Sequence, residues 1–91
     1  MLKPQTTTKY DQDLERMKRR GKKIEKINAV IALLCNGDKL DPKYRDHQLT
    51  GHLKNFRECH IEPDWLLIYK IQNEELILVL TRTGTHSDMR F

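Results

Sequence analysis

The stretch His60-Ile61-Glu62-Pro63-Asp64-Trp65 is a polar corner between two segments that are predicted to be β-strands. It brings one imidazole, two carboxylates and one indole to the end of a hairpin, where a rigid sheet can hold them within reach of solvent. Glu-Pro-Asp is also good turn chemistry in any protein, so the corner is equally compatible with a simple chain reversal. A functional corner and a simple turn are distinguished by the residues that the rest of the chain brings close to it.

The segments around the corner have the sequence patterns of an antiparallel sheet. Residues 65–71 and 76–82 are almost continuously apolar, as expected for central strands covered on at least one face, and residues 72–75 form the turn between them. Residues 54–61 alternate with period two. This alternation gives the strand one mostly polar face, which consists of Lys54, Phe56, Glu58 and His60.

Two helices are predicted before these strands. The first has a capping pair at Thr8 and Asp11 and ends at Gly21, and the second ends in a left-handed cap at Asn36-Gly37. Apolar side chains recur every three or four residues, so each helix has one apolar stripe. With one further strand before the helices, the sequence predicts an α+β fold. Two N-terminal helices pack on one face of a small, mainly antiparallel sheet of four to five strands.

The length and the apolar runs limit the class of protein. We expect residues 1–91 to form a single small domain. The longest apolar run, residues 29–35, is far too short to span a bilayer. The first residues lack the apolar core of a secretion signal, so we expect a cytoplasmic protein without a membrane partner. Cys35 and Cys59 fit no metal spacing and no redox pair, which favours two small buried side chains in a reducing compartment.

The positive charge is concentrated in the first part of the chain. The net charge is +4, but residues 1–37 hold nine Lys/Arg against four Asp/Glu, which gives +5. Residues 38–91 hold eight against nine, which gives −1. Such a local basic surface attracts polyphosphate without reading sequence, and the alternative is a solvated helix junction. The basic cluster consists of Lys18, Arg19, Arg20, Lys22 and Lys23.

Titratable side chains gather on the open face of the predicted sheet and at its rim. His47 lies at the first strand after the helices, His60 and Asp64 at the corner, and Arg82 and His86 where the last strand leaves the sheet. Three histidines and a carboxylate first suggest a metal. However, no pair has the short helical or loop spacing of a structural site, and the nearby arginine would repel a cation. We therefore expect no metal and no cofactor.

Acid/base cleavage of RNA fits these residues better. An RNA strand cleaves itself when its 2′-hydroxyl is deprotonated, the charge on the phosphorane is stabilised and the leaving 5′-oxygen is protonated. Histidine and aspartate can transfer the protons, and a fixed guanidinium can stabilise the charge. Trp65 adds a face on which a base could stack. The alternative for Trp65 is an aromatic side chain at the edge of the core.

Three motifs resemble those of the RelE superfamily of bacterial toxins, and most closely its YafQ branch. They are Tyr44-Arg-Asp-His-Gln-Leu-Thr-Gly51, Phe56-Arg-Glu-Cys-His-Ile-Glu-Pro-Asp-Trp-Leu-Leu-Ile-Tyr69 and Arg82-Thr-Gly-Thr-His86. The helical hairpin before them matches in position, so the resemblance covers nearly the whole chain. It implies a small sheet packed on two N-terminal helices. It also implies a metal-independent ribonuclease that enters the ribosomal A site and cuts the mRNA there.

The resemblance implies roles for the five residues that match the motif positions. His86 is the candidate general acid, and Arg82 would hold the scissile phosphate. Asp64 with His60 would activate the 2′-hydroxyl or orient the group that does. His47 would position the phosphate or a base. Related toxins distribute the acid and base roles differently, so the identity of the general base stays open.

The resemblance also implies a surface that contacts RNA. Trp65 matches a residue beside the substrate. YafQ-like proteins carry a functional aromatic near the end, and here Phe91 lies about one position beyond the spacing expected after His86, with Arg90 in its place. The remaining expected contacts are Lys54 on the polar strand face and the basic cluster Lys18, Arg19, Arg20, Lys22 and Lys23.

Members of this family bind a cognate antitoxin, usually a small protein with a ribbon-helix-helix part and a tail that wraps the toxin. The resemblance therefore implies an antitoxin, the ribosome and mRNA as partners, and a monomer for the free toxin. The basic cluster would then serve both ribosomal RNA and an acidic antitoxin segment. Two alternatives stay open: a non-catalytic interaction module of the same superfamily, and a ribonuclease that acts without the ribosome.

Overall fold

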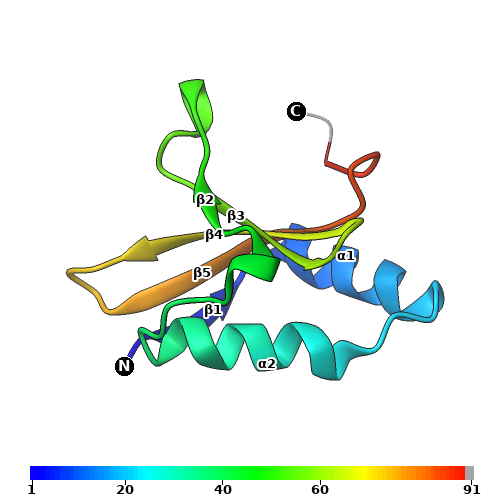
Figure 1. The fold of residues 1–91 in the computed structure, drawn as a ribbon, viewed down its shortest axis with the longest axis horizontal. Helices are drawn as coiled ribbons and strands as arrows, with labels where there is room; N and C mark the ends of the chain where they lie inside the picture. Colours follow the sequence, from blue (N-terminus) through cyan, green and yellow to red (C-terminus); the bar gives the residue numbers. More distant parts are fainter. Residues whose placement is uncertain (90–91) are drawn as a thin grey trace.

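The computed structural model describes residues 1–89, which form two α-helices and one five-stranded sheet. Both helices lie on one side of the sheet, and Figure 1 shows them beneath it. This is the predicted α+β arrangement, with the sheet at the upper limit of the predicted size. In chain order the elements are β1 (Lys3–Thr6), α1 (Thr8–Arg19), α2 (Ile24–Cys35), the 3-10 turn η1 (Pro42–Tyr44), β2 (His47–Gln48), the 3-10 turn η2 (Gly51–Leu53), β3 (Arg57–Glu62), β4 (Trp65–Gln72) and β5 (Ile77–Gly84).

The sheet is antiparallel except at one edge. Its strand order is β1-β5-β4-β3-β2, and β1 pairs in parallel with the first half of β5, from Lys3 opposite Ile77 to Thr6 opposite Leu80. The second half of β5 therefore extends beyond β1. The helix α1 lies beside this second half of β5, so side chains of α1 reach the end of that strand.

Several predicted element boundaries were wrong, including the last strand, which was predicted over residues 76–82 and runs from Ile77 to Gly84. The strand predicted over residues 54–61 begins only at Arg57, because η2 precedes it and Lys54 follows that turn. The helix cap is Thr7 and not Thr8. The Thr7 hydroxyl accepts a hydrogen bond from the backbone N–H of Tyr10 at 3.0 Å and donates one to the carbonyl of Thr81 at 2.8 Å. The cap thus also fastens α1 to β5.

The second helix ends as predicted. Gly37 has a φ of +78°, in the left-handed region, and the backbone N–H of Asp38 returns to the carbonyl of Leu33 at 3.0 Å. This satisfies carbonyl groups that the end of a helix leaves unpaired. The chain then crosses back to the sheet through η1, which lies beside β3.

Apolar side chains pack on both faces of the sheet. The main cluster lies between the helices and the sheet and includes both cysteines, Cys35 and Cys59, which are buried as predicted. A smaller cluster on the other face was not expected, because that face of the sheet was predicted to be open. It consists of Leu66, Ile68 and Met89, with Leu49 and Phe56 packed against it. The face opposite the helices is therefore partly covered.

Two segments rise from the sheet on the side away from the helices, as Figure 1 shows. One is the arm formed by β2 and η2, and the other is the segment that follows β5. None of the helices in the described part of the chain is long and apolar enough to cross a membrane.

Candidate functional site

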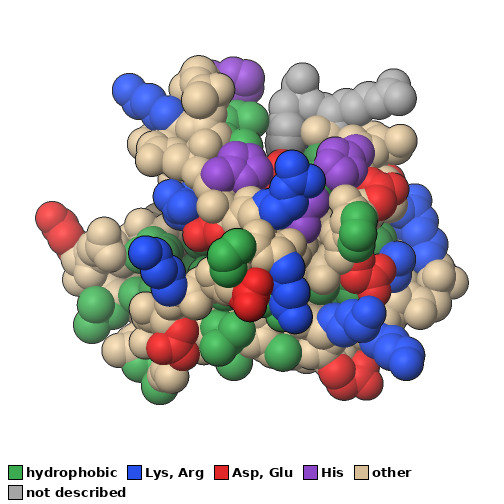
Figure 2. Space-filling view, in the orientation of Figure 1, with side chains coloured by type: hydrophobic (Ala, Val, Ile, Leu, Met, Phe, Trp, Pro, Cys, Tyr) green, Lys and Arg blue, Asp and Glu red, His purple; other side chains and the backbone are tan. Residues whose placement is uncertain are grey.

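The strand register places His60 and Arg82 on the face of the sheet opposite the helices. His60 of β3 pairs with Leu66, and Arg82 of β5 pairs with Ile68. Residues directly opposite each other in a ladder share a face, and both β4 residues belong to the smaller cluster away from the helices. Figure 2 shows the histidines gathered in the upper half of the molecule, between the arm and the C-terminal segment.

Three histidine rings form a row across this face. The ring centroids of His47 and His60 lie 6.4 Å apart, and those of His60 and His86 lie 5.7 Å apart. The middle ring is buried, with 9 % of His60 exposed, and its Nδ1 has no hydrogen-bond partner among the described residues. Burial lowers the pKa of His60 below its ordinary value of 6.5, and the neighbouring Arg45 and histidines add to that shift. His60 is therefore neutral at pH 7 and able to accept a proton.

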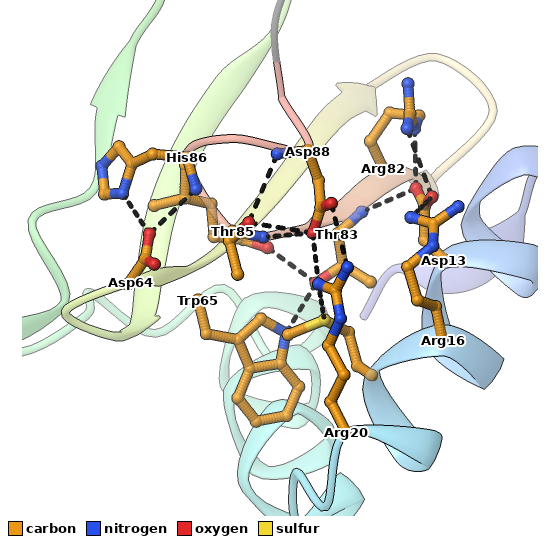
Figure 3. A network of polar contacts seen from close by, with 12 residues as sticks. Asp13, Arg16, Arg20, Asp64, Trp65, Arg82, Thr83, Thr85, His86 and Asp88 are labelled. Atoms are coloured by element: carbon orange, nitrogen blue, oxygen red, sulfur yellow. Dashed lines mark hydrogen bonds and ion pairs between the residues drawn. The ribbon is translucent and has the colours of Figure 1, made fainter.

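Asp64 and His86 meet at the outer end of the row (Figure 3). The carboxylate Oδ1 of Asp64 accepts a hydrogen bond from the backbone N–H of His86 at 2.9 Å and contacts its ring Nδ1 at 2.5 Å. These hydrogen bonds hold the pKa of Asp64 below its usual range, so the carboxylate is charged near neutrality. A charged acceptor at Nδ1 makes that nitrogen the donor and leaves Nε2 directed away from Asp64.

His47 is held at the other end of the row by local contacts. Its ring Nδ1 lies 2.7 Å from the carbonyl of Arg45, and its Nε2 lies 3.5 Å from a carboxylate oxygen of Glu58. Glu58 stands opposite His47 in the β2–β3 ladder. The side chain of His47 remains half exposed, so it borders the site from the solvent side.

The guanidinium of Arg82 is held by the buried carboxylate of Asp13 in α1. Its Nε donates to Asp13 at 2.6 Å and its Nη2 at 3.2 Å, and 21 % of the Arg82 side chain is exposed. The contact raises the pKa of Arg82 further above its ordinary value. Sequence reasoning found Arg82 but missed Asp13. An aspartate three residues before Arg16 in a helix indicates only a surface ion pair.

Trp65 does not belong to the substrate surface, which corrects the sequence interpretation. It is fully buried, with 0 % exposed, and it lies on the helix side of the sheet. Its indole N–H donates to the hydroxyl of Thr83 at 2.9 Å, and that hydroxyl donates to the carbonyl of Leu66 at 2.6 Å. The alternative of a core aromatic is therefore the right one, and the corner offers no indole face for a base.

The basic cluster is in contact with the corner and with the C-terminal segment. Lys22 of the cluster donates to Glu62 of the corner at 2.7 Å, and Lys26, which follows the cluster in the chain, donates to the same carboxylate at 2.8 Å. Arg20 donates to Asp88 at 2.7 and 3.3 Å. The structure thus joins the basic cluster to the His/Asp site through ion pairs, whereas the sequence suggested two separate regions.

The other members of the cluster differ in their contacts. Lys18 pairs with Glu15 within α1 at 3.2 Å, which is an exposed pair of small energetic weight. Arg19 and Lys23 are exposed, and no ion pair with another residue of the 1–89 segment involves them. Lys54 is exposed at the end of η2 and has no ion pair there either. Phe91, the predicted C-terminal contact, lies outside the described residues.

A groove of about 700 Å³ lies beside the site, between α2, η1 and the end of β3. His60, the middle residue of the histidine row, also lines this groove, so the groove and the row share one side chain. The other walls of the groove carry both signs of charge together with apolar residues. The basic residues are Lys26, Lys43 and Arg45, and the acidic ones are Glu25 and Glu62, of which Glu62 is paired with Lys26. Within residues 1–89, no group of three or more His, Cys, Asp or Glu side chains is placed to hold a metal ion.

Two helices packed on one face of a five-stranded, mostly antiparallel sheet are the fold of RelE-like toxin domains. A model of the family described as "Bacterial toxin of type II toxin-antitoxin system, YafQ" matches residues 2–90. The chain therefore belongs to the YafQ family of toxins of bacterial type II toxin–antitoxin systems.

Individual relatives agree with this assignment. The chain is 39 % identical over 79 residues to the mRNA interferase toxin YafQ of Escherichia coli strain K12, and the match covers 86 % of this chain and 84 % of the relative. A metal-bound toxin from Helicobacter pylori is 42 % identical, with a TM-score of 0.93 and coverage of 99 % of this chain and 100 % of the other. The toxin of the E. coli DinJ-YafQ complex is 32 % identical, with a TM-score of 0.89 and full coverage of both chains.

Proposed function

We propose that this chain is an mRNA endoribonuclease toxin that acts on translating ribosomes in the cytoplasm and is neutralised by an antitoxin. The names of the relatives support the activity, since two curated relatives are mRNA interferase toxins. We further propose that residues 1–91 act as one domain and that cleavage needs neither a metal nor a cofactor. The acid/base row supplies the groups for such a reaction from the chain itself.

The proposed reaction uses each side chain of the site for one task. A base removes the proton of the 2′-hydroxyl, and the 2′-oxygen attacks the adjacent phosphorus. The bond from phosphorus to the 5′-oxygen then breaks, and an acid protonates that oxygen. The products are a 2′,3′-cyclic phosphate and a 5′-hydroxyl end. The negative charge of the phosphorane is stabilised by Arg82, whose guanidinium is already oriented.

The contact between Asp64 and His86 carries the proposal. The carboxylate on Nδ1 fixes the orientation of the ring and leaves Nε2 free to face the leaving oxygen, where it would act as the proton donor. His60, neutral and 5.7 Å away between ring centroids, is suited to the base side of the reaction. His47 would contact the phosphate or a base, because it is more exposed than His60.

The test measures cleavage of a reporter mRNA in a purified translation system. The 5′ ends are mapped for the wild type, for His86→Ala and for His52→Ala. Removal of a general acid should lower the cleavage rate about 10²- to 10⁴-fold. His52 is the matched control, because it is exposed in η2 and does not belong to the row. Equal cleavage by wild type and His86→Ala would remove His86 from the mechanism.

The same assay separates the two alternatives. Cleavage of free RNA at the rate seen on ribosomes would identify a ribosome-independent ribonuclease. A non-catalytic module would bind the antitoxin and leave the mRNA intact in every condition. The complete set of His86, Asp64, His60 and Arg82 on one face favours the enzyme.

We propose that the groove beside His60 receives an acidic, extended segment of the antitoxin. Solved structures of the E. coli DinJ-YafQ complex support an antitoxin partner. Lys43 and Arg45 on the groove wall favour acidic side chains, and the groove has the volume of a typical binding cleft.

Ala29→Glu should weaken antitoxin binding, because it places bulk and negative charge inside the groove. Ala32→Glu makes the same change on the exposed surface of α2 away from the groove, and it should bind as the wild type does.

A further inference from the structure

Asp13 is a charged side chain buried in the middle of α1, with only 2 % of it exposed. Burial of a carboxylate costs free energy unless charged donors and hydrogen bonds surround it. Its Oδ2 accepts hydrogen bonds from the Nε of Arg82 at 2.6 Å and the backbone N–H of Thr83 at 3.2 Å. Its Oδ1 accepts from the Nη2 of Arg82 and the Nη1 of Arg16, both at 3.2 Å. Two guanidinium groups and one amide thus converge on this carboxylate.

These contacts restrict the orientation of Arg82. An arginine has five N–H donors in one plane, and Asp13 takes the Nε–H and one of the Nη2 donors. The remaining three donors belong to the outer edge of the guanidinium. The peptide N–H of Thr83 needs a partner because β1 ends opposite Leu80, and Asp13 supplies it. The side chain and the strand that carries it are therefore fixed by the same group.

A second contact of α1 lies two helical turns further along. Arg20 follows Asp13 by seven residues, so the two side chains leave the helix in nearly the same direction. Figure 3 shows Arg20 reaching the segment after β5, where it donates to both carboxylate oxygens of Asp88. Asp88 in turn accepts from the backbone N–H of Thr85 at 2.9 Å and from its hydroxyl at 3.0 Å. Thr85 immediately precedes His86.

The segment around Asp88 is closely packed. A Cβ added at Gly84 would lie 2.9 Å from both the side chain of Asp88 and the side chain of Met89. Met89 is buried in the smaller apolar cluster. The segment that carries His86 therefore has little freedom once Arg20 holds Asp88.

We propose that α1 positions both halves of the site: Asp13 orients the guanidinium of Arg82, and Arg20 acts through Asp88 on the segment that holds His86. Asp13 and Arg20 are positioning residues, since neither touches the scissile phosphate in the proposed reaction. The inference rests on the proposed function for its kinetic consequences. Its geometric content, the orientation of Arg82 and of the His86 segment, can be measured without cleavage.

The Arg20 contact is tested by exchanging the charges of the pair. Arg20→Asp and Asp88→Arg should each lower kcat about 10²-fold, because a displacement of about 1 Å at a reacting group has that effect. The double variant Arg20→Asp with Asp88→Arg keeps the net charge and should recover most of the lost kcat. A double variant as slow as the single variants would overturn this part of the proposal, and so would single variants with wild-type kcat.

The Asp13 contact is tested with Asp13→Asn, which keeps the size of the side chain and removes its charge. We expect kcat to fall about 10²-fold with a smaller change in KM. Asp11→Asn is the matched control, because Asp11 is exposed in the first turn of α1 and forms no ion pair with another residue of the 1–89 segment. Asp13→Glu is the second variant should Asp13→Asn fail to fold, and it displaces the charge by one methylene. Wild-type kcat in a folded Asp13 variant would overturn the proposal.

A nuclear magnetic resonance measurement separates this inference from the proposed function. The Nε–H signal of Arg82, assigned by its loss in Arg82→Lys, should be sharp in the wild type and should shift and broaden in Asp13→Asn. An unchanged signal in Asp13→Asn contradicts the orientation of Arg82 by Asp13, whatever the activity. Absence of cleavage by the wild type, together with a shifted signal in the variant, would instead contradict the proposed function alone.

Discussion

One carboxylate oxygen of Asp64 binds His86 twice, through the backbone N–H at 2.9 Å and through the ring Nδ1 at 2.5 Å. The two contacts fix the ring relative to its own backbone, so the direction of Nε2 is determined by a residue 22 positions earlier in the chain. Asp64 lies in the turn between β3 and β4, and His86 follows β5. The pair therefore joins the turn between β3 and β4 to the segment that follows β5.

Substitution of Asp64 tests the value of this orientation. Asp64→Asn removes the charged acceptor that orients the His86 ring, and we expect mRNA cleavage to fall about 10²-fold at pH 7. The pKa of Asp64 is depressed in the folded protein, so its stabilising contacts are present above its ordinary value of 3.8 and are lost as the pH falls below it. Cleavage and chemical denaturation measured side by side would show whether the variant loses activity while it stays folded. A folded variant with full activity would contradict the role of Asp64.

The pH dependence of cleavage tests the neutral state of His60. Burial lowers its pKa, so kcat/KM should rise with pH through a midpoint below 6.5 and then stay level near neutrality. The same shift affects stability, because below pH 6.5 the unfolded chain binds a proton that the folded chain does not. The free energy of unfolding should therefore decrease as the pH falls through that value, and His60→Gln should remove this component. A rising limb that is unchanged in His60→Gln would assign the base to another residue.

Trp65 provides a prediction about stability instead of substrate binding. Trp65→Phe removes the hydrogen bond to Thr83 and should lower the free energy of unfolding by about 1 kcal/mol, with KM for the translating ribosome unchanged. Trp65→Ala leaves a large cavity in the main cluster and should cost about 3–5 kcal/mol. Urea denaturation measures both values. A large increase in KM for Trp65→Phe without loss of stability would return Trp65 to the substrate surface.

The ion pairs divide the basic cluster into two groups with different expected effects. Arg19→Glu with Lys23→Glu changes exposed charges that have no ion pair in residues 1–89, and it should weaken ribosome association and reduce its dependence on salt. Lys3→Glu with Lys39→Glu is the control, because it makes the same change in net charge at exposed positions outside the cluster. Sedimentation with ribosomes at several salt concentrations gives both slopes. If ribosome association depended on salt in the same way for both double variants, the cluster would be only a solvated helix junction.

The sequence predicted the parts of the fold that depend on local periodicity. The two helices and the three long strands follow from the spacing of apolar residues, which is set by the geometry of each element. The face on which Trp65 lies could not be read in this way, because residues 65–71 are almost continuously apolar and the register between His60 and Glu62 shifts at the corner. The identity of that face is a property of the pairing and not of the pattern.

The charged residues that contact the site from α1 could not be predicted from local sequence patterns either. Asp13 contacts a residue 69 positions away, and Arg20 one that is 68 positions away. Helix periodicity assigns both to a polar surface, since the end of β5 becomes their neighbour only after the sheet forms. The candidate His, Asp and Arg residues could be found from the motifs, whereas the groups that contact and orient them required the structure.

The parallel pairing of β1 with β5 has a consequence for the synthesis of this protein. Residues 3–6 form their ladder with residues 77–80, so the first strand has no partner until nearly all of the sheet-forming chain has been made. Contacts of such large sequence separation form slowly, because a long loop must close before they contribute. The positions of Arg82 and His86 depend on the last strand of the same ladder. The candidate site is therefore complete only after the last strand has docked.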